Sequence, residues 1–176
     1  MKRKETGKIA LTGLLSALAV VILYFGSVLE ILDLTTAAVA SFLVYFAVIE
    51  LGGMYPWSLW LISSVLSIVL LPNKFGAAIF AVFAGVYPMF KLLFERNNAW
   101  ISWILKMSMF DTALVLTLVL SKHFFAAQAE GMAIDIVFFV LGNITFVLYD
   151  LAMTKLLILY TVKIRSRLKI DRLFKK

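Results

Sequence analysis

The sequence predicts an all-α integral membrane protein with six transmembrane helices and both termini in the cytoplasm. Three observations predict this fold class: the apolar composition, the length of the apolar runs and the placement of the charges. Of the 176 residues, 63% are hydrophobic and 15% are charged, and the mean hydropathy is +1.00. A chain this apolar has too little polar surface to cover a core in water, which excludes a soluble globular domain.

Six apolar segments have the length that a bilayer requires, which is about 20 residues per helix. Polar and turn-forming residues separate them at 52–53, 72–74 and 95–98, so these connecting loops are short. The first segment follows a basic start, but it is too long for a cleaved signal peptide, and we expect a retained helix. The segments, in order, are Ile9–Gly26, Leu34–Leu51, Tyr55–Leu71, Phe75–Phe94, Trp100–Leu120 and Met132–Tyr160.

The distribution of Lys and Arg predicts how the helices are oriented. With a cytoplasmic N-terminus, the outer loops hold only Lys74 and Lys122 of the 17 basic residues, and an even number of spans returns the C-terminus to the cytoplasm. The Trp residues then form an aromatic belt at the inner interface: Trp57, Trp60, Trp100 and Trp103.

We therefore expect a multi-pass protein of the cell membrane. Residues 1–162 form a single six-helix membrane domain, and residues 163–176 form a basic cytoplasmic tail. Apolar residues alternate with basic ones in this tail, which favours a short helix lying on the inner leaflet. The alternative is that the tail is a docking site for a cytoplasmic protein.

The residue inventory gives little support for an enzyme. The chain contains no Cys and a single His, His123, and it lacks the HExxH, GxxxxGK[ST] and GxSxG patterns of metal-dependent, nucleotide-dependent and serine hydrolases. We therefore expect no catalytic residue, no metal and no cofactor, and any energy for transport must come from partner proteins. The positive charges gather at the termini, which favours an anionic membrane face over a nucleic-acid partner.

Charged residues inside the apolar segments are costly in lipid and are therefore the first functional candidates. Three acids and three bases fall in the inner half of the bilayer, and their charges cancel. A balanced set favours a structural ion-pair network, whereas unpaired carboxylates along a path favour a proton or ion relay. We expect the network, with the relay as the alternative. The six residues are Glu50, Lys91, Lys106, Asp111, Asp150 and Lys155.

A second polar set falls toward the outer face and predicts a binding site for a small polar molecule that enters from outside. Aromatic rings in this set offer stacking surfaces. The alternative for the loop residues is that they are only solvated, and the alternative for the amide in the sixth segment is that it holds two helices together. The candidate residues are Tyr24, Glu30, Asp33, Asn73, Lys74, Phe80, His123 and Asn143.

Small residues at helical spacing mark faces where two helices can approach closely. One such stripe consists of Ala77, Ala81 and Gly85, and another consists of Gly13 and Ala17, four residues apart in the first segment. Such stripes are typical of packing inside a protein. The pair in the first segment also suits contact with a partner helix.

The stretch from Lys8 to Val21, KIALTGLLSALAVV, resembles the first helix of the substrate-binding S components of energy-coupling factor (ECF) vitamin transporters. Members of that family are six-helix membrane proteins with cytoplasmic termini, so the resemblance extends to the architecture of the whole chain. It implies that Gly13 and Ala17 contact a transmembrane T component. It also implies that substrate binds toward the outer side and that two ATPases in the partner module drive its release.

The function that we expect is therefore a non-enzymatic, substrate-capture membrane subunit of an ECF-type importer for a small, vitamin-like molecule. Its partners are the lipid bilayer, the T component, the ATPase subunits and the small-molecule ligand, with no nucleic acid. The strongest alternative is a non-catalytic scaffold subunit of a cell-envelope assembly, which needs packing faces but no pocket. A standalone proton-coupled carrier is the third hypothesis.

Overall fold

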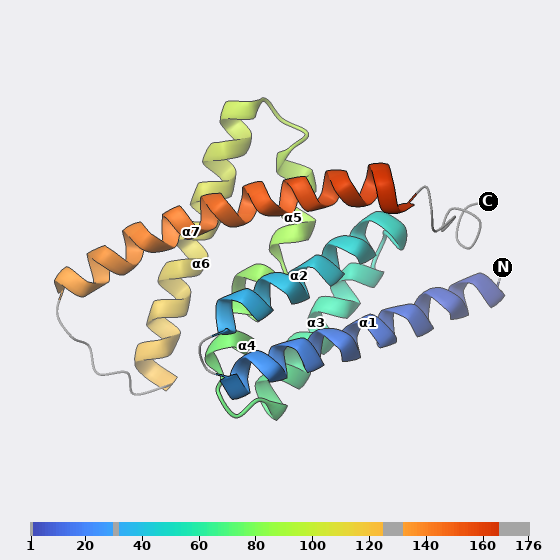
Figure 1. Ribbon diagram of the computed structural model, residues 1–176, viewed down its shortest axis with the longest axis horizontal. Helices are drawn as coiled ribbons and strands as arrows, with labels where there is room; N and C mark the ends of the chain where they lie inside the picture. The colour runs from blue at the N-terminus through green and yellow to red at the C-terminus, as the bar shows by residue number, and fades with distance from the viewer. Residues whose placement is uncertain (1, 30–31, 125–131, 166–176) are drawn as a thin grey trace. The chain divides into compact units, whose positions relative to one another are not determined.

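The computed structural model describes residues 2–29, 32–124 and 132–165 (Figure 1). Within these ranges the chain is all-helical and contains no strand, which confirms the predicted fold class. In the described part of the chain, five helical segments are long and apolar enough to cross a membrane, and a sixth apolar helix has 16 residues. Which side of a membrane the termini face stays a prediction.

Each predicted apolar segment has a helical counterpart, and the ends differ by up to seven residues. The first three helices are α1 (Lys2–Leu29), α2 (Asp33–Glu50) and α3 (Tyr55–Leu70). The fourth segment is divided into α4 (Phe75–Ile79), a π-helical turn η1 (Phe80–Ala84) and α5 (Tyr87–Phe94). The remaining elements are α6 (Ala99–Phe124), α7 (Met132–Leu159) and a second π-helical turn, η2 (Tyr160–Ile164).

The chain forms two compact units. The first unit contains the residues up to Met89 together with those from Met153 onward, and the second unit is Phe90–Ala152. The two boundaries between the units therefore fall inside α5 and α7.

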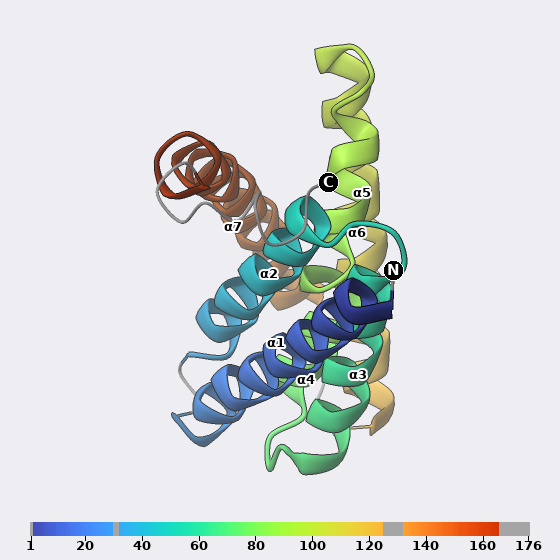
Figure 2. The same cartoon turned by 90° about the vertical axis from the view of Figure 1, so that its right-hand side faces the viewer.

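In the first unit, α1 lies alongside α2 and α3 (Figures 1 and 2). Small side chains occupy much of the contact, which lets the helix backbones approach closely. A Cβ atom at Gly26 would overlap the side chain of Thr36 on α2, so only glycine fits at this crossing. The buried small residues are Thr12, Ser16, Ala19 and Ser27 on α1, Ala37, Ala40, Ser41 and Ala47 on α2, and Ser63, Ser64 and Ser67 on α3.

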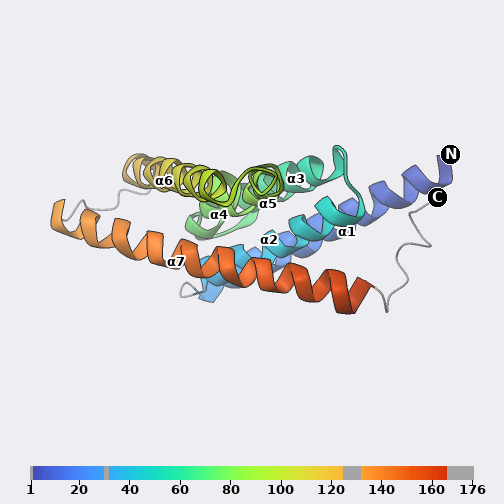
Figure 3. The same cartoon turned by 90° about the horizontal axis from the view of Figure 1, so that it is seen from above.

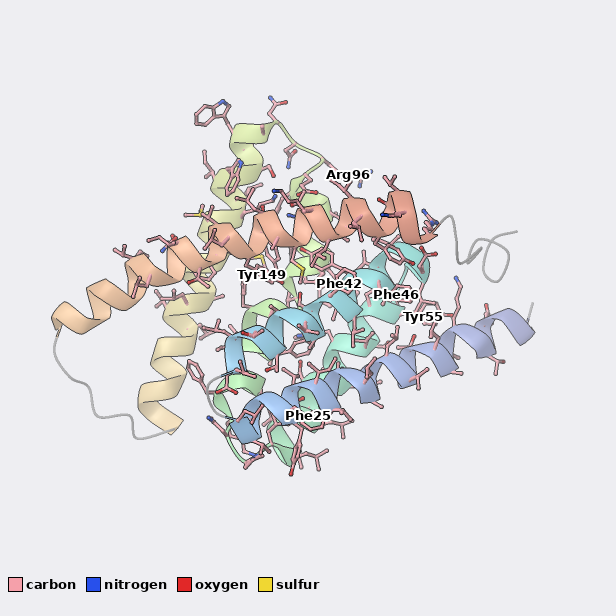
Figure 4. The ribbon with its side chains drawn as sticks, in the orientation of Figure 1. Phe25, Phe42, Phe46, Tyr55, Arg96 and Tyr149 are labelled. Carbon is pink, nitrogen blue, oxygen red and sulfur yellow. The ribbon has the colours of Figure 1, made fainter. Side chains whose placement is uncertain are left out.

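The turn between α2 and α3 depends on two glycines. Gly52 and Gly53 have φ angles of 63° and 58°, a left-handed conformation that glycine adopts at the end of a helix without steric cost. The Lys8 ammonium donates to the Leu51 carbonyl at 3.3 Å and lies 5.5 Å from the ring centroid of Tyr55, which Figure 4 labels. These contacts attach the start of α1 to the α2–α3 turn.

The π-helical turn η1 is stabilised by a side chain from α3. The indole N–H of Trp60 donates to the Ala81 carbonyl at 3.0 Å and so supplies a donor from outside the helix. A Cβ atom at Gly85 would lie 2.9 Å from the Phe80 carbonyl oxygen and in conflict with the Trp60 ring. The stripe of Ala77, Ala81 and Gly85 therefore packs inside the first unit.

In the second unit, α6 meets α7 near the middle of the two helices (Figure 3). The rings of Phe110 and Phe146 stack with centroids 4.6 Å apart and an interplanar angle of 11°. One turn away, a Cβ atom at Gly142 would lie 2.6 Å from the Leu114 side chain. A larger residue at this position on α7 would therefore require the flexible end of the Leu114 side chain to shift.

Candidate functional site

Four charged residues of the second unit form a closed set of ion pairs, which we call the ion-pair ring: Lys91, Glu95, Lys106 and Asp150. The Lys91 ammonium pairs with the Asp150 carboxylate and lies 3.1 Å from Glu95 Oε1. The Lys106 ammonium lies 2.8 Å from Glu95 Oε1 and 3.2 Å from Asp150 Oδ2. Each lysine thus contacts both carboxylates, and each carboxylate contacts both lysines.

The ion-pair ring is electrically balanced and largely buried. The side chains of Lys91, Asp150 and Lys106 are 0%, 3% and 6% exposed, and Glu95, at the end of α5, is 38% exposed. In a buried site, a charge remains stable only when its partners compensate for the water that it has lost. The ring joins α5, α6 and α7, so we expect it to stabilise the packing of these helices.

The position of Asp111 differs from the one that the sequence predicted. Its carboxylate is not a member of the ion-pair ring, and Oδ1 instead accepts a hydrogen bond from the Asn143 side-chain amide at 3.1 Å. The reason is helical geometry: Asp111 follows Lys106 by five residues, and side chains on one helix meet at separations of three or four. Asn143 also donates to the Phe139 carbonyl at 3.0 Å.

Glu50 belongs to the first unit and has contacts of its own there. Its carboxylate is 3% exposed, accepts a hydrogen bond from the Tyr160 hydroxyl at 3.1 Å and lies 3.1 Å from Arg165 Nε. The Tyr160 ring meets Phe46 edge to face, with centroids 5.6 Å apart; Figure 4 labels Phe46. Lys155 is exposed and forms no ion pair with a described residue.

Two members of the predicted substrate site meet in the first unit. The Asn73 side-chain amide donates to Asp33 Oδ2 at 3.3 Å, and Asn73 Oδ1 accepts from the Phe75 amide at 3.0 Å. The Ser27 hydroxyl donates to the Asn73 carbonyl at 2.9 Å and accepts from the Asn73 backbone amide at 2.8 Å. We call Ser27, Asp33 and Asn73 the Asn73 cluster, because Asn73 joins the end of α1 and the start of α2 to the α3–α4 connection.

None of the other described ligand candidates is a member of this hydrogen-bonded cluster. Phe80 is fully buried in the first unit, so it packs in the core and presents no ring face to a ligand. The Lys74 ammonium donates to carbonyls at the end of α3, Tyr24 is exposed on α1, and Asn143 belongs to the second unit. Glu30 and the side chain of His123 lie outside the described part of the chain.

The small pair of α1 faces away from the core. Gly13 and Ala17 are exposed, and a Cβ atom at Gly13 would meet no other atom within 4 Å. The packed side of α1 uses Thr12 and Ser16 instead, which are 4% and 1% exposed. We call the surface around Gly13 and Ala17 the open α1 face.

Among the described residues, no group of three or more His, Asp or Glu side chains is placed to hold a metal ion.

Comparisons of the chain with known proteins identified no relative. No protein-family model, no curated protein and no solved structure matches the chain.

Proposed function

We propose that the chain is the substrate-capture subunit of an ECF-type importer for a small, vitamin-like molecule, and that it works in the cell membrane with partner ATPases. The open α1 face carries this proposal. Lipid chains can pack beside bulky and small side chains alike, so a lipid-facing surface does not require small residues. Small residues are required where the backbone of a second helix approaches closely. Gly13 and Ala17 provide such a place on a side of α1 that no described residue covers.

The distance between the two ends of α1 supports separate sites for substrate and partner. Gly13 precedes Ser27 by 14 residues, which places them roughly 21 Å apart along the helix axis. The Asn73 cluster, with the carboxylate of Asp33 and the amide of Asn73, therefore lies far from the open α1 face. A capture subunit needs this separation, because it must be able to bind its ligand whether or not the partner subunit occupies the open α1 face.

A scaffold subunit of the cell envelope is the alternative, and one observation favours it. The backbone and side chain of Asn73 are occupied by Ser27, Asp33 and Phe75, so its polar groups already have partners within the protein. A scaffold has no small molecule to retain.

Mass spectrometry of the purified protein distinguishes these two functions. We expect a small polar molecule at close to one copy per chain, and we expect Asp33→Asn to weaken its retention about tenfold, the cost of one charge-assisted hydrogen bond. Thr35→Ala, an exposed change two residues away on α2, is the matched control and leaves retention unchanged. Recovery of lipids alone would support the scaffold.

Thiol labelling tests the orientation that the proposal requires. The chain has no Cys, so single cysteines at Lys74 and Met54 give unambiguous signals. We expect an impermeant reagent applied outside intact cells to label position 74 and to reach position 54, which is 75% exposed, only after the membrane is opened. Labelling of position 54 in intact cells would show that the orientation is the reverse of the predicted one.

A further inference from the structure

One side of α6 forms a shallow groove of about 550 Å³, which we call the α6 groove. Of the residues that the structure describes, those that line it all belong to α6. Its first half is apolar and contains Trp100, Trp103, Ile104 and Met107. Its second half is polar and contains Ser108, Asp111 and Thr112.

The α6 groove has the spacing of a helix-packing seam. Trp100, Ile104, Met107 and Asp111 follow one another at intervals of four, three and four residues. This alternation keeps side chains facing a single neighbouring helix that crosses at about 20°. Val115, four residues beyond Asp111, is exposed and extends the seam.

Asp111 gives this seam a negative charge that the described residues of the second unit do not neutralise. Its carboxylate accepts a hydrogen bond from the neutral amide of Asn143 and forms no ion pair with a described residue. The ion-pair ring uses two lysines and two carboxylates and is already balanced. The charge of Asp111 is therefore left facing the groove.

The depth of Asp111 makes a lipid neighbour unfavourable. It follows Ala99, the first residue of α6, by 12 residues, or roughly 18 Å along the helix axis, which is near the middle of a bilayer core of about 30 Å. The Thr112 hydroxyl already donates to the Ser108 carbonyl at 2.8 Å, but acyl chains offer no hydrogen-bond donor to the Asp111 carboxylate. Polar residues at this depth face protein or a water-filled path.

We propose that the α6 groove seats a transmembrane helix of a second protein, and that a Lys or Arg near the middle of that helix pairs with Asp111. Charge complementarity selects this occupant. A second copy of the chain, packed symmetrically, brings two Asp111 carboxylates together. A small organic cation gains little enclosure from a groove lined by one helix, since ligand pockets bury most of their ligand. This surface is distinct from the open α1 face and does not depend on the proposed function.

Energy transfer in lipid vesicles tests the proposal with defined probes. The chain carries a donor on a single cysteine at Asn98, and each acceptor-labelled probe is a 21-residue Leu/Ala transmembrane peptide with Lys, Gln or Glu at its centre. We expect the Lys peptide to associate at least about tenfold more tightly than the Gln peptide, and the Glu peptide to associate most weakly. The Asp111→Asn substitution should lower the association of the Lys peptide to the level measured for the Gln peptide.

Thr145→Val, which removes an exposed hydroxyl on α7 outside the groove, is the control and should leave all three associations unchanged. The wild-type chain is decisive by itself, because equal association of the Lys and Gln peptides overturns the proposal whatever the variants do. A preference for the Lys peptide that survives in Asp111→Asn also overturns it. Displacement of the peptide by millimolar ethylammonium would assign the groove to a small cation, and stronger transfer between two chains than to the peptide would assign it to a second copy.

Discussion

Asp150→Asn should lower the free energy of unfolding by about 3 to 5 kcal/mol, the cost of breaking a buried ion pair by removing one partner. Asp150 contacts both Lys91 and Lys106, so its neutralisation leaves two buried ammonium groups to share the partly exposed carboxylate of Glu95. Thermal unfolding of the purified protein in detergent, together with unfolding by denaturant, measures the loss.

Two controls separate the ion pairs from a general effect of the substitution. Asp111→Asn makes the same chemical change on α6, outside the ion-pair ring, and should alter stability by less than about 1 kcal/mol. The double change Lys91→Met with Asp150→Leu removes both charges and should recover most of the lost stability, as apolar replacements of buried pairs do. A large loss in Asp111→Asn with none in Asp150→Asn would contradict the ion-pair ring.

Gly13→Leu combined with Ala17→Leu should reduce substrate uptake by cells to background and abolish co-purification with a coupling module. Each leucine adds bulk where the proposal requires two backbones to approach closely, and such interfaces do not absorb extra methylene groups. The isolated protein should remain as stable as the wild type, because the space around Gly13 is open and leucine favours a helix more than glycine does. Ligand retention by the purified variant should also be unchanged.

Ala152→Leu provides the matched control, since it adds the same side chain at an exposed position of α7. Uptake by this variant should equal that of the wild type. If the double leucine variant still takes up substrate, the open α1 face is not a coupling surface. If the double leucine variant unfolds, Gly13 and Ala17 are not exposed in the folded protein as described.

Hydropathy was sufficient to predict that the helices exist and roughly where they lie, because a continuous apolar run is stabilised by transfer into lipid. The predicted segment from Tyr55 to Leu71, for example, differs from α3 by one residue. Hydropathy did not predict that α1 begins seven residues before Ile9, in the polar start of the chain. The π-helical turn at Phe80–Ala84 was not predicted. It is associated with a tertiary contact, the hydrogen bond from Trp60 to Ala81, which no pattern within the fourth segment encodes.

The pairing of the charges was predictable only in part. Charge balance predicted one network that includes Lys91, Lys106 and Asp150, and in the structure both lysines contact Asp150. Charge balance does not define how a helix is rotated about its axis. Asp111 therefore has a different partner from the one expected, and Glu50 pairs with Arg165, which belongs to the predicted tail. Glu95 was assigned to a loop, although its spacing of four residues from Lys91 was a usable signal.

Transport by the purified chain alone in sealed liposomes tests the capture function most directly. The measurement follows the small molecule that the protein retains, in vesicles without any ATPase and with or without a proton gradient. The proposed function predicts saturable binding with no accumulation inside the vesicles, because the energy for release comes from partner subunits. Concentrative uptake by the chain alone would contradict it and identify a standalone carrier.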